Sequence, residues 1–520
     1  MKNLFIYDTT LRDGAQAQGI SFTVEDKLKI VKALDDIGIS YIEAGNPGSN
    51  PKDMEFFEKI KNIKLKNSKL FAFGSTRKAN ISVEEDTNVV ALLKAETKGV
   101  TIFGKSWDFQ VKEILRTTLE ENLKMIYETI RFLKQKGKEV VYDAEHFFDG
   151  YKSNREYALK SLEAAFEAGA DSICLADTKG GSFPMEIFEI TKNIVNKFNI
   201  EIGIHCHNDN GMAVADSIMA VEAGARQVQG TINGYGERCG NANLCTLIPN
   251  LQLFKGYECV PKENLKNLTY LSRYISEIAN ITHDERAPFV GKNAFSHKAG
   301  MHADAVNKNT FSYELFDPSL IGNNRTFLIS EVGGRGAVLN AISEIDPTIT
   351  KESAETKIIL DKLKELEYLG YQYENAGGSL ELLIRKVIGK YKPAFNLREF
   401  KAIVNEPSVN SVNSYAIIKV EVDGIEEIAA AEGNGPVHAL DNAVRKALER
   451  FYPQIKEIKL TDFKVRVLDS ASATAAKVRV IIESTDGNDS WSTIGVSTDL
   501  IEASWEALID SIEYKLNKEG

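Results

Sequence analysis

The first half of the chain repeats one pattern, a short apolar run followed by a longer amphipathic stretch. Within the longer stretches, apolar residues recur at three- and four-residue spacing, which is typical of helices that bury one face. Eight strand–helix units in about 250 residues predict a (β/α)8 TIM barrel, an α/β fold. The alternative is an open doubly wound sheet. The predicted strands lie near 4–7, 41–43, 70–73, 100–103, 140–142, 172–175, 201–204 and 227–232, and the helix-like segments include 25–37, 119–135, 156–168 and 213–223.

In the remainder of the chain the sequence pattern changes twice. From about residue 262 helical patterns dominate, as in 265–280 and 352–369, with Gly pairs at 333–334 and 377–378. After Pro393 the pattern strand, strand, helix occurs twice, as an internal repeat typical of a small α+β unit. The copies comprise 414–423, 426–432 and 438–451, then 475–484, 490–497 and 501–516. We predict a catalytic barrel over 1–260, a mostly helical connector contributing to the active site over 261–392, and a regulatory α+β domain over 393–520.

Composition excludes several classes of protein. The 520 residues carry 63 Lys and Arg against 74 Asp and Glu, a net charge of −11 without any basic block. Nucleic acids and anionic membranes need clustered cations, so neither is an expected partner. No run of about 18 apolar residues and no signal-peptide core occurs, and five irregularly spaced cysteines favour a reducing compartment. We expect a soluble, cytoplasmic protein that binds small molecules.

Three glycines, Gly234, Gly236 and Gly240, follow the last predicted strand of the barrel. Their spacing, G-x-G-x-x-x-G, and their position both differ from the phosphate-binding turn of a Rossmann unit. A nicotinamide cofactor is therefore not expected.

Polar residues follow five of the predicted strands. In a parallel barrel the loops after the strands form the reactive face, so these residues converge on one end. The segments are DTTLRDG (8–14), DAEH (143–146), DTKGG (177–181), HCHND (205–209) and ERCGN (237–241). The pattern indicates a single active site.

His205 and His207 are two residues apart, so their rings project to the same side of an extended strand while Cys206 points away. Two imidazoles with one carboxylate form a facial ligand set for a divalent metal such as Zn, Mn or Fe. Asp13 is the natural carboxylate, because the first and seventh strands are separated by one neighbour in a closed barrel. Cys206 and Cys239 are further conceivable ligands, although buried small thiols are the commoner interpretation.

Three more residues at the strand ends carry useful chemistry. Arg12 stays charged and suits polarising a carbonyl or holding a developing alkoxide; the alternative is a structural ion pair with Glu43, Glu145 or Glu237. Glu145 is a candidate acid/base or substrate-orienting group. Thr178 can donate a hydrogen bond to a carboxylate or cap its turn. Phe103, Lys105 and Asp143 are candidates to line the substrate pocket, or to fill core and ion-pair roles.

The connector contains a polar stretch dense in histidine, SHKAGMHAD (296–304). It is either a solvated loop or a segment that reaches an active site.

Several of these motifs resemble those of a known group of enzymes. The strings DTTLRDG (8–14), HCHNDNG (205–211), GERCGNAN (236–243) and SHKAGMHADAV (296–306) resemble the acyl-CoA-condensing enzymes of the DRE-TIM metallolyase group. These are the 2-isopropylmalate, homocitrate and citramalate synthases. Two C-terminal stretches, 465–484 and 491–516, resemble the regulatory domain of the isopropylmalate and citramalate enzymes. Segments 48–57, 101–111, 142–152 and 227–252 are most similar to the (R)-citramalate synthase branch, which condenses acetyl-CoA with pyruvate on a route to isoleucine.

The resemblance implies a role for each barrel residue. A divalent metal (Mn, Mg or Zn) would be held by Asp13, His205 and His207, with Asn241 as a further ligand. Arg12 would activate the keto oxygen, Glu145 would orient or deprotonate, and Thr178 would hold the oxo-acid carboxylate. The implied reaction is a metal-dependent Claisen condensation of acetyl-CoA, the co-substrate, followed by thioester hydrolysis to (R)-citramalate and CoA.

The resemblance also implies roles for the connector and the C-terminal domain. His302 and Tyr313 match residues that these enzymes bring to the active site from the partner subunit, which implies a homodimer. The general base stays open among His302, Glu145 and Tyr313. The C-terminal domain is expected to bind isoleucine as an end-product inhibitor.

Two departures from the family pattern leave the oxo acid open. Lys179 and Gly181 stand in ADTKGG, and Ala44-Gly45-Asn46 replaces a glycine/aromatic pair. A 2-isopropylmalate synthase using 2-oxoisovalerate is the main alternative. A hydroxy-acyl-CoA lyase is a weaker one, because a mobile Gly-Cys-Pro loop is lacking and a C-terminal domain is present. A catalytically silent sensor conflicts with the intact site.

Overall fold

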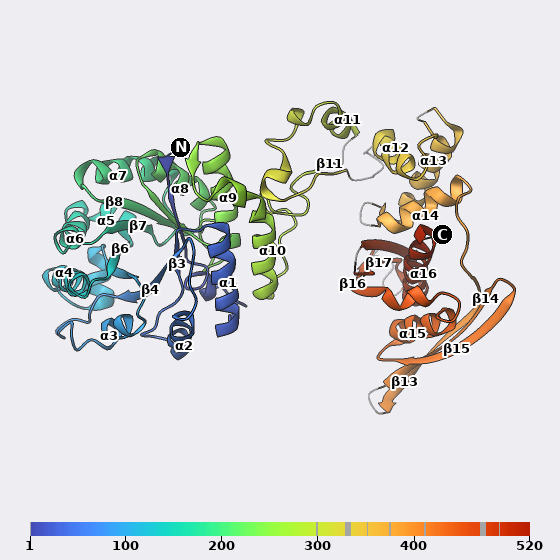
Figure 1. The fold of residues 1–520 in the computed structure, drawn as a ribbon, viewed down its shortest axis with the longest axis horizontal. Helices are drawn as coiled ribbons and strands as arrows, with labels where there is room; N and C mark the ends of the chain where they lie inside the picture. The colour runs from blue at the N-terminus through green and yellow to red at the C-terminus, as the bar shows by residue number, and fades with distance from the viewer. Residues whose placement is uncertain are drawn as a thin grey trace. The chain divides into compact units, whose positions relative to one another are not determined.

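The computed structural model describes residues 2–297, 300–327, 334–350, 352–373, 376–409, 412–468, 475–487 and 489–519. The chain forms two compact units, whose elements are labelled in Figure 1. The first comprises Met1–Phe295 and Phe316–Arg325, and the second comprises Ser296–Leu315 and Thr326–Gly520. Among the described residues, no helix combines the length and the apolar character needed to span a bilayer.

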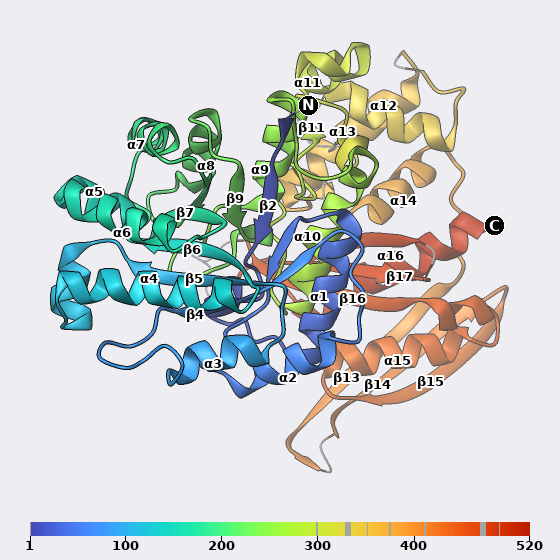
Figure 2. The same cartoon turned by 60° about the vertical axis from the view of Figure 1, so that its left-hand side comes forward.

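The first unit is a closed barrel of eight parallel strands, surrounded by helices (Figure 2). All eight predicted runs are strands, which confirms the TIM barrel and excludes the open sheet. The barrel closes where β9 pairs with β2, with Tyr7 opposite Gln229. The strands are β2 (Phe5–Asp8), β3 (Tyr41–Glu43), β4 (Lys69–Ser75), β5 (Gly99–Lys105), β6 (Glu139–Glu145), β7 (Ser172–Asp177), β8 (Glu201–Cys206) and β9 (Gln227–Gly230).

The helices of this unit alternate with the strands. They are α1 (Val24–Ile37), α2 (Pro51–Ile60), α3 (Thr87–Lys94), α4 (Leu119–Gln135), α5 (Phe147–Ser153), α6 (Arg155–Glu167), α7 (Pro184–Lys197), α8 (Ala213–Glu222), α9 (Leu244–Pro249) and α10 (Leu268–Ile278). Two short strands, β1 (Lys2–Asn3) and β10 (Tyr257–Glu258), pair outside the barrel.

Helix α1 illustrates how the sequence sets these elements. It starts at Thr23, whose hydroxyl accepts a hydrogen bond from the Asp26 amide while the Asp26 carboxylate accepts one from Thr23 N. This capping box satisfies amides that the first helical turn leaves unpaired. The helix ends at Gly38 with φ of 98°, a left-handed conformation that glycine adopts without strain.

The first unit continues past the predicted boundary at 260. Leu268, Leu271 and Ile275 of α10 are buried in the same apolar core as Ile30 of α1. Thr269 Oγ1 also donates to the carbonyl of Ile321, at 2.8 Å. The helical pattern from 265 to 280 thus belongs to the barrel's outer layer, because its apolar face packs on the barrel helices.

The second unit begins with the connector, which is mostly helical as predicted. Its helices are α11 (Gly300–Lys308), α12 (Gly334–Ile345), α13 (Ala354–Leu369) and α14 (Gly377–Val387), and its short strands β11 (Ser296–His297) and β12 (Thr326–Phe327) pair in parallel. Of the first predicted Gly pair, Gly333 lies outside the described residues.

The C-terminal repeat has three strands in each copy, where the sequence predicts two. Each copy is an antiparallel sheet followed by a helix that packs on it (Figure 1). The predicted strands and helices are present, but the first strand of each copy, β13 and β16, is missing from the prediction. The elements are β13 (Asn396–Val409), β14 (Val412–Val422), β15 (Ile425–Gly433), α15 (Pro436–Leu448), β16 (Lys459–Val467), β17 (Val478–Thr485), β18 (Ser490–Ser497) and α16 (Leu500–Glu519).

Both missing strands lie at sheet edges. In β16 eight of nine residues are exposed, so neither face shows the apolar alternation of a half-buried strand. Pro407 lies within β13, where a proline argues against a strand except at an edge or an irregularity. The register of β13 shifts between Val404 and Val409, around that proline. Residues 469–474, part of the stretch that resembles the regulatory domain, lie outside the described residues.

Candidate metal and substrate site

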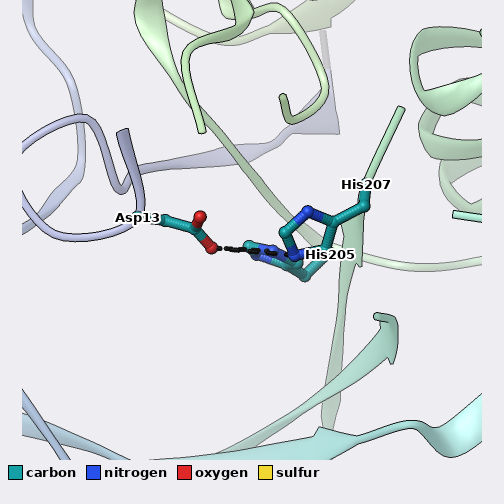
Figure 3. A group of neighbouring side chains, drawn as sticks. All are labelled: Asp13, His205 and His207. Carbon is teal, nitrogen blue, oxygen red and sulfur yellow. Dashed lines mark ion pairs between the residues drawn. The ribbon is translucent and has the colours of Figure 1, made fainter. Parts of the chain in front are cut away.

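Asp13, His205 and His207 come together at the carboxyl end of the barrel (Figure 3). His205 lies in β8 and His207 just beyond it, while Asp13 lies in the loop after β2. Asp13 Oδ2 is 3.4 Å from His205 Nε2 and 3.8 Å from His207 Nε2. All three residues are buried. Within the described part of the chain, this is the one group of three or more His, Cys, Asp or Glu residues with ligand atoms within 4.8 Å of one another.

Hydrogen bonding orients the first histidine. His205 Nδ1 lies 3.0 Å from Gln229 Oε1 on the neighbouring strand β9. With Nδ1 engaged by Gln229, Nε2 is the ring nitrogen that faces Asp13 and would bind a metal. Burial, together with His205, lowers the pKa of His207 to about 4. His207 is therefore neutral, the form that binds metal ions.

Charge also keeps Asp13 ionised. Burial favours the neutral carboxyl, but the positive charge of Arg12 and the contact with His205 outweigh it and hold the pKa of Asp13 well below its usual range. Its Oδ1 atom is buried and has no hydrogen-bond partner among the described residues. A buried carboxylate oxygen without a partner fits a cation ligand.

Asn241 adds an oxygen donor next to the histidines. It forms an isolated β-bridge with His207, and its Nδ2 donates to the carbonyl of Tyr235 at 3.1 Å. Its Oδ1 is buried and, among the described residues, has no hydrogen-bond partner. Amide oxygens are accepted ligands of divalent cations, so this atom fits the predicted fourth position.

The glycines after β9 make room for Asn241. A Cβ at Gly236 would lie 2.1 Å from Asn241 Nδ2, and a Cβ at Gly240 would lie 2.0 Å from the Gly234 carbonyl oxygen. Gly240 also has φ of 88°. The spacing that does not fit a dinucleotide loop therefore belongs to a tight turn that presents the asparagine.

Arg12 is anchored by two carboxylates. Its Nε donates to Glu43 Oε1 at 2.5 Å, and its Nη1 donates to Asp13 Oδ2 at 3.2 Å. Of the three predicted structural partners, Glu43 is the one it pairs with here. Its guanidinium carbon lies 3.8 Å from the centroid of the Phe73 ring. The ion pair and the catalytic role are compatible, because these contacts fix the guanidinium beside the metal-ligand set.

A cavity of about 230 Å³ opens over these residues. It is smaller than the roughly 300–1,000 Å³ typical of drug-sized ligands, which suits a small substrate. The rings of Phe73 and Phe103 stack with centroids 5.1 Å apart and form its apolar wall. The lining residues are Arg12, Asp13, Gln16, Phe73, Phe103, Asp143, Glu145, Ala176, Thr178, His205, His207, Glu237 and Arg238.

Glu145 and Thr178 both line this cavity. Glu145 Oε2 lies 2.5 Å from Lys105 Nζ, so Lys105 acts as an ion-pair partner and is absent from the lining. Thr178 Oγ1 accepts a hydrogen bond from the His146 amide at 2.8 Å, which leaves its hydroxyl hydrogen for a ligand. Asp143 also lines the cavity, and burial raises its pKa to about 6.

Three lining residues, Gln16, Phe73 and Ala176, are missing from the sequence prediction. Gln16 lies four residues after Arg12 in the loop that follows the first strand, a spacing that could have signalled it. Phe73 and Ala176 are apolar residues within the strands β4 and β7, so no chemical pattern distinguishes them from core residues.

The departures from the family pattern do not remove a site residue. Lys179 Nζ lies 3.5 Å from Asp149 Oδ1 and 5.5 Å from the centroid of the Trp107 ring, and Lys179 is absent from the cavity lining. Asp53 Oδ2 accepts from the Asn46 amide at 2.8 Å, and a Cβ at Gly45 would clash with that carboxylate. Asn46 therefore sits in a structured turn at the edge of a neighbouring cavity.

His302 and Tyr313 belong to the second unit. Their rings stack with centroids 4.2 Å apart, and Tyr313 is 50% exposed. His297 Nε2 lies 3.0 Å from Glu314 Oε1, so the two ends of this segment are in contact. Lys298 and Ala299, within the predicted histidine-rich stretch, lie outside the described residues. The role of His302 and Tyr313 at the barrel site stays a prediction.

Three family matches cover most of the chain. Residues 3–275 match the HMGL-like family, residues 289–369 match the homocitrate synthase post-HMGL domain-like family, and residues 375–516 match the LeuA allosteric (dimerisation) domain. The last match begins just before α14, so this helix belongs with the C-terminal repeat.

Similar proteins align over their full lengths. The (R)-citramalate synthase of Aquifex aeolicus is 54% identical over 520 residues, covering 100% of this chain and 98% of that protein. The (R)-citramalate synthase of Synechocystis is 49% identical, with coverages of 99% and 96%. A probable 2-isopropylmalate synthase of Methanopyrus kandleri is 31% identical, with coverages of 98% and 97%.

Proposed function

The chain belongs to the (R)-citramalate synthases, enzymes of the DRE-TIM group with an HMGL-like barrel, and we propose that its barrel site performs their condensation with the residues described above. The reaction joins acetyl-CoA to pyruvate and, with one water, yields (R)-citramalate and CoA. The observation that carries the residue assignment is the buried set of Asp13, His205 and His207 at the mouth of the barrel.

The donor set fits a divalent metal. Asp13, His205, His207 and the Asn241 oxygen supply two neutral nitrogens, one carboxylate and one amide oxygen, a mixture that Mn, Mg or Zn sites use. When bound, such an ion acts as a Lewis acid toward the ketone oxygen of the oxo acid. The unpartnered oxygens of Asp13 and Asn241 support this assignment.

Arg12 supplies the second positive charge at the ketone. Because Glu43 and Asp13 hold its guanidinium in place, the charge is preorganised and little reorganisation is needed as negative charge develops on the oxygen. Thr178 donates its hydroxyl hydrogen to the carboxylate of the oxo acid, on the opposite side of the cavity. Together these contacts orient the ketone carbon for attack.

The stacked rings of Phe73 and Phe103 favour pyruvate over larger oxo acids. The wall they form is apolar and the cavity is small, so a methyl substituent is accommodated more readily than an isopropyl group. A carboxylated substituent, as in 2-oxoglutarate, would lie against this apolar wall without an ion-pair partner.

Acetyl-CoA approaches through a second cavity of about 240 Å³, which shares Arg12, Gln16 and Phe73 with the first. Lys27 and Lys52 also line it. This arrangement supports binding of the thioester beside the ketone, with the bulk of CoA extending away from the barrel. A base removes a proton from the acetyl methyl group, the resulting carbon attacks the ketone carbon, and water then cleaves the thioester.

The base is Glu145, His302 or Tyr313. Glu145 lies in the cavity, and its ion pair with Lys105 orients the carboxylate. His302 and Tyr313 would enter from a partner subunit. Their stacked and exposed rings support a role that is completed against another surface.

The second unit carries an allosteric dimerisation domain, and we assign it isoleucine as effector and a second copy of the chain as partner. On the face of β13 and β14 away from α15, the side chains of Ile403, Tyr415 and Ile417 are exposed. An exposed apolar face of this kind supports association of two copies through the sheet.

Release of free CoA from acetyl-CoA tests the proposal. Pyruvate, 2-oxobutyrate, 2-oxoisovalerate and 2-oxoglutarate are offered in turn, with and without added divalent metal. We expect turnover with pyruvate that a chelator abolishes. Preference for 2-oxoisovalerate would move the chain to the isopropylmalate branch, and absence of CoA release with every acid would contradict the proposed function.

A further inference from the structure

Arg238 connects three of the loops that surround the metal and substrate site. It lies in the loop after β9, and its Nε and Nη2 donate to the two carboxylate oxygens of Asp209, at 2.7 and 3.0 Å. Asp209 lies in the loop after β8. Nη2 also donates to the carbonyl oxygen of Thr178, in the loop after β7, at 2.8 Å. The planar guanidinium therefore bridges a carboxylate on one loop and a carbonyl on another.

Thr178 is held from both sides. On the β6 side the amide of His146 donates to Thr178 Oγ1 at 2.8 Å, and on the β9 side Arg238 donates to its carbonyl. These two contacts fix the backbone and the hydroxyl oxygen of the same residue. The hydroxyl hydrogen then has a restricted set of directions, which include the cavity that Thr178 lines.

The loops after β7 and β8 also contact each other directly. A Cβ at Gly180, which has φ of 61°, would lie 2.8 Å from the Asp209 amide nitrogen. Asn210 N also donates to the Gly180 carbonyl at 3.1 Å. Arg238 itself adopts a left-handed φ of 54°, which is uncommon for a residue other than glycine. A conformation of this kind persists where the surrounding contacts hold it.

We propose that Arg238 is a positioning residue for the oxo acid: its bridge from Asp209 to the Thr178 carbonyl aims the Thr178 hydroxyl at the substrate carboxylate. The inference rests on the role proposed above for Thr178. A surface ion pair alone contributes little to stability. Here, however, the hydrogen bond from Arg238 to the Thr178 carbonyl links the Arg238–Asp209 pair to a residue that lines the cavity. Lysine cannot make the same three contacts, because it lacks the planar fork.

Steady-state CoA release by the full-length chain with bound metal tests this role. The variants are Arg238→Gln, Arg238→Lys, Asp209→Asn, Thr178→Val and the double variant Arg238→Gln/Thr178→Val. Arg226→Gln is the matched control, because Arg226 directly precedes β9 at the opposite end of the same strand. The readouts are KM for pyruvate, KM for acetyl-CoA and the melting temperature.

We expect Arg238→Gln to raise KM for pyruvate about tenfold, the size of effect for a lost charged hydrogen bond, with KM for acetyl-CoA and the melting temperature unchanged. Arg238→Lys is expected to show nearly the same rise in KM for pyruvate as Arg238→Gln. Asp209→Asn is expected to show a smaller rise in KM for pyruvate, again without a change in KM for acetyl-CoA. The double variant is no worse than Thr178→Val alone, because Arg238 acts through Thr178. Arg226→Gln behaves as the unmodified chain.

Three results would overturn the inference while leaving the proposed function standing. They are additive effects in the double variant, a rise in KM for acetyl-CoA equal to that for pyruvate, and a fall in melting temperature with unchanged KM. An unaltered KM for pyruvate in Thr178→Val would remove the role of Thr178 and this inference together. Absence of CoA release by the unmodified chain would instead refute the proposed function itself.

Discussion

The barrel mouth and the histidine-bearing segment of the second unit present their functional groups in opposite ways. In the barrel, Asp13, His205 and His207 are each at most 6% exposed and are held at the ends of β2 and β8, which β9 separates. In the second unit, His302 is exposed and Tyr313 is half exposed, and the two rings stack on each other. The difference supports a metal site built by one chain, and we propose that the connector groups act against a further surface.

The largest effect is expected from removing the charge of the metal-binding carboxylate. Asp13→Asn keeps the shape of the side chain but loses the anion that faces both histidines and Arg12, so metal is lost and turnover falls by about 1,000-fold or more. Metal content by elemental analysis and CoA release check this. Cys206→Ala is the control, because Cys206 lies between the histidines and faces away from them; equal losses in both variants would contradict the assigned site.

Replacing Arg12 tests whether catalysis needs the planar guanidinium group and not only its positive charge. Arg12→Lys retains a cation but cannot contact Glu43 and Asp13 together, so we expect kcat to fall by about 100-fold with metal content unchanged. Arg226→Lys serves as a distant control. An unchanged kcat in Arg12→Lys would remove the role assigned to Arg12 at the ketone oxygen.

Substitutions of the functional groups in the second unit should not reduce the amount of bound metal. His302→Ala and Tyr313→Phe are expected to lower kcat by about 100-fold, the lower end of the range for a lost proton-transfer group, without loss of bound metal. Mixing each variant with Asp13→Asn sharpens the comparison. Recovery of activity in the mixed dimers would show that one subunit supplies the metal site and its partner supplies the connector group, whereas no recovery would argue against that exchange.

Ligand-linked stability tests the regulatory assignment. Isoleucine at 100 times its Kd should stabilise the full chain by about 2.7 kcal/mol, and leucine should not. Thermal unfolding measures the shift. The control is a chain from which the C-terminal domain has been deleted. The deletion should begin near residue 370, not after Pro393, because Ser379 of α14 hydrogen-bonds to Asp510 of α16 at 2.6 Å and α14 therefore belongs to the deleted domain. Equal shifts with isoleucine and leucine would reject isoleucine as the specific effector.

The last prediction concerns a buried acid of the second unit and affects stability alone. Burial raises the pKa of Glu513 to about 7, against hydrogen bonds from the amides of Ala394 and Phe395. Because the folded pKa exceeds the unfolded one, the group's contribution to stability is present at low pH and is lost as the pH rises from about 4.5 to 7. Relative to the unmodified chain, Glu513→Gln should gain at most about 3 kcal/mol over that window. A difference in unfolding free energy that does not vary with pH would contradict this account.

The sequence predicted the barrel because each strand is a short buried run bounded by an amphipathic helix. It also predicted the residues that gather at one end, since the ends of parallel strands meet by geometry. It could not predict β13 and β16, because edge strands lack the buried alternation that marks a strand. The bridge from Arg238 to Thr178 was equally hidden, because it joins loops 60 residues apart through a backbone carbonyl.

The most direct test of the central claim is a metal titration of the chelator-treated chain. CoA release from acetyl-CoA and pyruvate is followed as Mn²⁺ is added, in parallel for the unmodified chain and for Asp13→Asn. The account predicts activity that returns in proportion to one ion bound per chain in the former and stays absent in the latter. Full activity of the metal-free chain, or equal recovery in Asp13→Asn, would contradict it.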